Sequence, residues 1–148
     1  MKPSVFATMT VAVALAASAA SAQEWAGTVK AVAGSASAER EGKLLPLGVG
    51  DKVYPKDKLV TGKDSRIAVT LRDDTLISTG ADSRLALNEF AFDAATQGGS
   101  LFVSVLRGVT AMVSGLVAKA NPHAMRVTTP TATIGIRGTE FIVEVEGE

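Results

Sequence analysis

The sequence contains no cysteine, and it has one histidine, one tryptophan and one tyrosine. The absence of cysteine excludes disulfide bonds, thiol nucleophiles and cysteine-ligated zinc. Lys plus Arg and Asp plus Glu both total 15, so no excess of positive charge favours nucleic acid as a partner. Hydrophobic residues make up 47% of the 148 residues, a fraction far too high for a disordered chain. The composition therefore predicts one folded domain with few catalytic side chains.

The first 22 residues differ in composition from the rest of the chain. Lys2 is their one charged residue, an apolar run covers residues 5–17, and Ala20-Ser21-Ala22 places small residues before Gln23. A positive start, an apolar middle and a small-residue end are typical of a secretory signal peptide. The run is shorter than the roughly 20 apolar residues that a membrane span needs. We therefore expect residues 1–22 to be removed on export, leaving a periplasmic domain of residues 23–148 without a stable transmembrane anchor.

The rest of the chain has the pattern of short β-strands. Apolar and polar residues alternate in residues 65–72, 84–88 and 140–146, as in strands that bury one face. Gly, Pro and Asp at the positions between these stretches indicate turns. Apolar residues follow helical spacing only within residues 109–120, before an Asn-Pro pair that would end a helix. The sequence predicts an all-β domain, either a small irregular β-solenoid or a β-sandwich, with at most one short helix.

The candidate catalytic and metal-binding groups lack the sequence context that their chemistry needs. His123 has no nucleophile motif nearby, which is typical of an exposed loop histidine. The aspartates at the predicted turns do not follow the spacing of an EF-hand loop. Asp73 and Asp74 are adjacent, so on a regular strand they point to opposite faces and do not form a catalytic pair. We expect no enzymatic activity, no metal and no cofactor.

The most distinctive stretch covers residues 127–141. It contains a Thr-Pro pair, an alternating apolar segment and the run G-I-R-G-T-E-F at residues 135–141. Here the sequence resembles the FecR domain family, in which a threonine-proline strand precedes R-G-T-E/D-F and the last strand. Weaker similarities in the same order extend the resemblance over residues 27–145. The resemblance singles out eight residues with a structural or recognition role: Thr129, Pro130, Gly135, Arg137, Gly138, Thr139, Glu140 and Phe141.

This resemblance implies a compact β domain in the bacterial envelope. The best-known members of the family are inner-membrane regulators that receive a signal from a TonB-dependent outer-membrane receptor and control a sigma factor. Those regulators also carry a cytoplasmic anti-sigma segment and a transmembrane helix, and neither is recognisable in this sequence. We therefore expect a non-catalytic module for protein docking or signal sensing, whose partner is another envelope protein.

The alternative function is the binding of a glycan or another small envelope molecule. Trp25 and Tyr54 are the large amphipathic aromatic residues that could stack on a sugar. We expect Trp25 to lie near a frayed end of the chain. This small aromatic content favours protein docking.

The last predicted strand carries an acidic row, in which Glu140, Glu144 and Glu146 alternate with apolar residues. Glu144 and Glu146 are the candidate interaction edge. Their charges either select a basic or polar partner or protect a strand edge from aggregation, and the sequence leaves both readings open. For Arg137 we expect a structural role, because its guanidinium group can tie the last strand to an earlier one.

Overall fold

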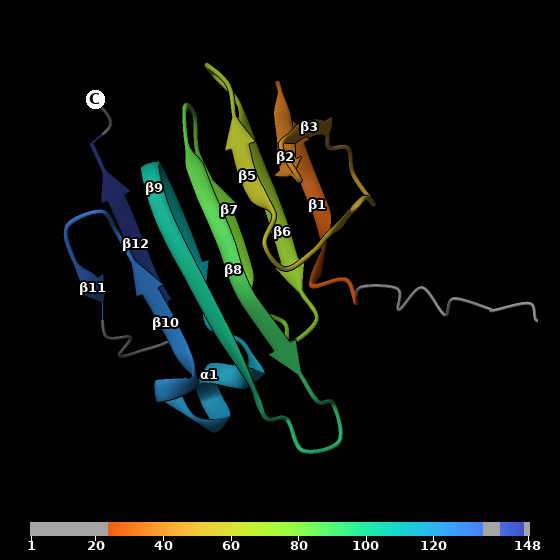
Figure 1. Cartoon of the computed structure of the whole chain (residues 1–148), viewed down its shortest axis with the longest axis vertical. Coiled ribbons are helices and arrows are strands. Elements are labelled where there is room, and N and C mark those ends of the chain that lie inside the picture. The colour runs from red at the N-terminus through yellow and green to blue at the C-terminus, as the bar shows by residue number, and fades with distance from the viewer. Residues whose placement is uncertain (1–23, 135–139, 147–148) are drawn as a thin grey trace, which may run out of the picture.

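The computed structural model describes residues 24–134 and 140–146 and places twelve strands, one α-helix and one 3-10 helix in them (Figure 1). The strands are β1 (Gly27–Ala33), β2 (Ala36–Arg40), β3 (Lys43–Pro46), β4 (Lys52–Val53), β5 (Lys58–Thr61), β6 (Arg66–Leu71), β7 (Leu76–Thr79), β8 (Arg84–Phe92), β9 (Gly99–Val113), β10 (Met125–Thr128), β11 (Thr133–Ile134) and β12 (Glu140–Val145). The helices are α1 (Leu116–Ala120) and the 3-10 helix η1 (Pro122–Ala124).

The strands form one curled sheet in two halves that share β9. In the first half the order is β4-β1-β6-β7-β9, with β12 also on β9, and in the second half it is β3-β2-β5-β8-β9, with β10 and β11 beyond β9. Figure 1 shows β11 and β12 on one side of the molecule and β1 to β3 on the other. The inward side chains of both halves form a single hydrophobic core.

β9 belongs to both halves because its buried face changes at Gly108. Leu101, Val103 and Val105 are buried before this residue, and Thr110 and Met112 are buried after it. Alternation alone would bury odd-numbered residues throughout, so the backbone must shift phase between the two groups. Gly108 has a φ of 90°, which a residue without a Cβ adopts at little cost. This glycine therefore lets one strand pass from one half of the sheet to the other.

Two similar segments support the two halves. The sequence Thr-Gly-x-Asp-Ser-Arg occurs at residues 61–66 and again eighteen residues further on, at 79–84. Ser65 Oγ accepts a hydrogen bond from the N–H of Ser35, and Ser83 Oγ accepts one from the N–H of Val109. Each serine packs against a glycine with positive φ, Gly34 or Gly108. The repeat therefore holds equivalent bends in the β1–β2 segment and in β9.

The structure confirms the all-β prediction and the single short helix. The alternating stretches are strands with one buried face: Ile67, Val69 and Leu71 are buried in β6, and Leu85 and Leu87 in β8. The strand pairs join all twelve strands into one curled, open sheet. Nearly all of them are antiparallel, and β9 with β10 is the one parallel pair recorded. Residues 109–113, which begin the stretch with helical spacing, extend β9 instead because they pair with β7 and β12.

Candidate docking groove and edge

A groove lies where β10 and β12 separate from each other along β9. β10 pairs with residues 101–104 of β9 and β12 with residues 108–113. Among the described strands, Val105 and Arg107 therefore have a ladder partner only on β8, and Leu106 lies at a register shift between them. The groove has a volume of about 530 Å³. Three segments line it, namely Leu106 and Arg107 of β9, Thr129, Pro130 and Thr131 after β10, and Glu144, Val145 and Glu146 at the end of β12.

Four of the residues singled out from the sequence therefore meet at this groove: Thr129, Pro130, Glu144 and Glu146. The Thr-Pro segment is held by a turn, because the N–H of Thr129 donates to the carbonyl oxygen of Ala132 at 2.8 Å. Thr129 Oγ1 in turn accepts from the N–H of Ala132 at 3.1 Å. These bonds leave Pro130 exposed at the rim of the groove.

The groove carries more negative than positive charge. Glu144 and Glu146 are exposed, and neither takes part in the three ion pairs recorded for the described residues. Arg107 is the one basic residue in the lining. Its Nε donates to the carbonyl oxygen of Asp82 at 3.0 Å, which directs the guanidinium toward the backbone of a turn. Two carboxylates are thus available to a cationic group brought by a partner.

From the groove, β12 continues as an open edge, since β9 is its sole ladder partner in the described part of the chain. Its inward side chains are Phe141, which is half-buried against the core, and Val143, which is buried. Its outward row contains Glu140, Ile142 and Glu144, and Ile142 is 70% exposed. Ile142 is a residue that the sequence analysis missed, although the alternation that revealed the acidic row also contains it.

Gly135, Arg137, Gly138 and Thr139 lie outside the described residues, as do residues 1–22. The roles expected for them stay predictions. Glu140 and Phe141 are the two residues of the G-I-R-G-T-E-F run that the structure describes, one facing outward and the other toward the core.

The groups considered for catalysis lie in structural positions. His123 is exposed in η1, where its N–H donates to Asn121 Oδ1. Asp73 is 0% exposed, and its carboxylate accepts from the N–H and hydroxyl of Thr75 and from the N–H of Val117. It therefore fixes the start of α1 beside the turn that follows β6. Within the described residues no cluster of three His, Cys, Asp or Glu side chains could hold a metal.

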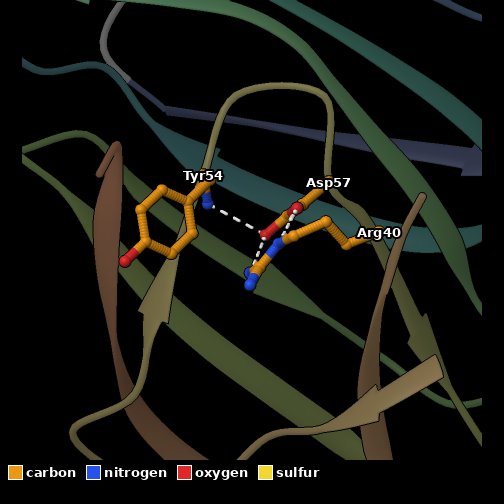
Figure 2. Close-up of polar contacts among 3 residues, drawn as sticks. All are labelled: Arg40, Tyr54 and Asp57. Atoms are coloured by element: carbon orange, nitrogen blue, oxygen red, sulfur yellow. Dashed lines mark hydrogen bonds and ion pairs between the residues drawn. The ribbon is translucent and has the colours of Figure 1, made fainter. Parts of the chain in front are cut away.

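An ion pair with a buried carboxylate, which the sequence analysis missed, joins β2 to the turn before β5 (Figure 2). Arg40 donates to Asp57 through Nε at 2.8 Å and Nη2 at 2.7 Å, and the N–H of Tyr54 donates to the same carboxylate at 2.9 Å. The pKa of Arg40 is raised above its ordinary value, mainly because its guanidinium donates to this carboxylate. The Tyr-Pro-x-Asp turn at residues 54–57 is visible in the sequence, but the sequence alone does not show which arginine pairs with Asp57.

Both aromatic residues considered for sugar stacking already contact a cation within the chain. The guanidinium of Arg40 lies 4.5 Å from the centre of the Tyr54 ring, and Nζ of Lys52 lies 4.0 Å from that of Trp25. Arg72 Nε also donates to the carbonyl oxygen of Trp25 at 2.7 Å. Trp25 is therefore tied to two neighbouring segments, and the expectation of a frayed end next to it concerns residues outside the described part of the chain.

The comparisons with known proteins agree with the resemblance seen in the sequence. The family model described as FecR protein matches residues 57–148, which is more than half of the chain. The match begins at Asp57, so β1 to β4 precede the matched region although they complete its sheet. No curated protein and no solved structure matches the chain.

Proposed function

This chain belongs to the FecR protein family, and from that premise we propose that it is an exported, non-catalytic module that docks on another protein of the cell envelope. The family is associated with signalling in the envelope, and it is a regulatory rather than an enzymatic family. The observation that carries the proposal is the groove beside β12. Two segments of the region matched by the family, residues 129–131 and 144–146, meet in this groove, and Glu144 and Glu146 make its surface acidic.

The partner that fits this surface best is an extended segment with basic side chains. An open strand edge binds such a segment through main-chain hydrogen bonds, while side chains at alternate positions provide specificity. A strand added beside β12 would place its outward residues next to Glu140, Ile142 and Glu144. Lys or Arg opposite the two glutamates and an apolar residue opposite Ile142 complement this row.

Export accounts for how the module reaches such a partner. Residues 1–22 have the three regions of a signal peptide. In the described part of the chain, no helix has both the length and the apolar character to cross a bilayer. We propose that the mature chain begins at Gln23 and acts in the periplasm.

The alternative is a module that binds a glycan or another small envelope molecule. The volume of the groove favours it, because about 530 Å³ lies within the usual range for small-molecule sites. The lining opposes it, since neither Trp25 nor Tyr54 is part of the groove and both rings are engaged elsewhere.

Photocrosslinking in intact cells tests the docking proposal. A photoreactive amino acid at Thr131, in the groove, is compared with the same probe at Val49, which is 71% exposed in the loop after β3. We expect one envelope protein to be captured from position 131 and not from position 49. Equal capture from both positions, or none from 131, would contradict docking at the groove.

Charge reversal then separates recognition from protection of the edge. Glu144→Lys and Glu146→Lys, each introduced with the probe at Thr131, lower the yield of the adduct if the carboxylates select the partner. An unchanged yield in folded variants would assign the acidic row to protection against aggregation. Binding of soluble glycan fragments that abolishes the adduct would support the alternative function instead.

A further inference from the structure

The first half of the sheet exposes a face with very little charge, which we call the uncharged face. Its members are the outward side chains of four adjacent strands: Ala68 and Thr70 of β6, Leu76 and Ser78 of β7, Val109, Ala111 and Val113 of β9, and Ile142 of β12. Leu76, Val109 and Ile142 are 44%, 39% and 70% exposed. A sheet face that meets water normally carries polar residues, and a contiguous apolar face marks an interaction surface.

Charged residues stand on the two outer strands of these four. Glu140 and Glu144 lie on β12, which has an open edge, and Arg66 is the first residue of β6, which pairs with β1 on its other side. Glu144 is opposite Val109 in the ladder, and Gly80 donates its N–H to the carbonyl oxygen of Val109. One step beyond the β6–β7 ladder, Arg66 is opposite Gly80. Glu144 and Arg66 therefore end the same row of residues across the four strands.

We propose that this face packs against the same face of a second copy of the chain. A two-fold axis that runs parallel to the strands, between β9 and β7, places β12 of one copy over β6 of the other and β9 over β7. Each strand then meets a strand at the same height, as in the aligned packing of two sheets about 10 Å apart. Such a contact is isologous, because the same surface serves both copies.

This arrangement brings complementary side chains together at most positions of the face. Ile142 faces Ala68 of the other copy, Val109 faces Gly80, Ala111 faces Ser78, and Val113 faces Leu76. At the end of the row, Glu144 of each copy faces Arg66 of the other. Ile142 and Val109 thus meet small residues, and Glu144 meets an opposite charge, while Glu140 faces Thr70.

The charges also exclude the other symmetric arrangement. A two-fold axis across the strands would place β12 over β12, so that Glu140 of one copy faces Glu144 of the other. Like charges opposed in this way destabilise an interface. The arrangement with the axis along the strands is thus the one that the surface favours. It uses Ile142 and Glu144, which the docked strand would also contact, so the dimer and that partner would compete for these side chains.

The size of the face predicts a weak dimer. Four strands about 4.8 Å apart and five residues of about 3.4 Å each cover roughly 19 by 17 Å. This is a small contact compared with the roughly 800 Å² that each partner buries in a standard interface. We expect dissociation at about 10–100 µM, so that dimers form where the protein is concentrated.

Sedimentation velocity over about 5–500 µM tests the proposal on the protein recovered from expressing cells. We expect a concentration-dependent dimer, and Ser78→Lys, at the centre of the face, to keep the protein monomeric. Ala91→Lys is the matched control, because Ala91 is also exposed on a strand but lies in β8, outside the face. Circular dichroism establishes that both variants are folded.

Charge exchange gives a second test that does not depend on Ser78. Arg66→Glu and Glu144→Arg each oppose like charges at both ends of the contact, and each should weaken the dimer by about tenfold. The two substitutions together restore opposite charges and should restore the dimer. A protein that stays monomeric throughout, or a dimer unaffected by Ser78→Lys and the charge reversals, would overturn the inference. Capture of a different protein at this face, lost with Ser78→Lys, would overturn it also. Glu146→Lys lies outside the face and should leave the dimer unchanged, so the docking proposal and this one fail separately.

Discussion

Replacing Arg40 should destabilise the protein more than replacing Asp57, although the two side chains form one ion pair. The Asp57 side chain is 1% exposed and that of Arg40 is 31% exposed. Arg40→Leu removes both guanidinium bonds and leaves a buried carboxylate without a counter-charge, which typically costs about 3–5 kcal/mol. Asp57→Ala leaves a guanidinium that can turn toward water. Its main effect is that the N–H of Tyr54 loses its acceptor, which should lower the free energy of unfolding by about 1–3 kcal/mol.

The double variant sharpens this prediction. Arg40→Leu with Asp57→Ala should cost less than the sum of the single changes by at least about 1 kcal/mol, because no charge is left buried.

Urea unfolding followed by circular dichroism measures these free energies, provided that the slope against urea is unchanged among the variants. The reasoning fails if Asp57→Ala is the more damaging change, or if the costs of the two single variants simply add.

Three further predictions concern the turns and the leader. Asp73→Ala should lower the free energy of unfolding by about 2–4 kcal/mol, because three donors of the α1 junction lose a buried acceptor; equal stability of variant and parent in urea would show that the junction does not need it. Gly108→Ala should lower the free energy of unfolding by about 2–4 kcal/mol, since a Cβ there would lie 2.6 Å from Ser83 Cα. Gly42→Ala, where φ is also positive but the space is open, should lower it by about 1 kcal/mol. Similar shifts in melting temperature for both variants would contradict the steric argument. The intact mass of the protein extracted from the envelope should correspond to a chain that starts at Gln23; a mass that includes residues 1–22 would contradict cleavage.

Local pattern determined the strands of this protein. The alternation in residues 65–72, 84–88 and 140–146 predicts β6, the start of β8, and β12 with the correct buried faces. Strand formation depends here on side chains that alternate between core and water, and this information is contained in neighbouring residues. The family motif and the acidic row could be read in the same way.

The arrangement of these strands was decided by contacts between distant segments. Residues 109–113 have apolar residues compatible with a helix, yet they pair with β7 and β12 because both strands offer unsatisfied backbone groups beside them. The Thr-Gly-x-Asp-Ser-Arg repeat is visible in the sequence, but its meaning, two serines that hold two bends, depends on segments about 30 residues away.

The sequence by itself determined that this is an all-β chain with an acidic last strand, because period-two alternation and turn residues act locally. The tertiary structure alone decided that residues 129–131 and 144–146 share a groove, that Arg40 neutralises Asp57, and that four strands align their uncharged side chains on one face. Each of these depends on ladder register, and register is set by the packing of the whole sheet around its core rather than by any one segment.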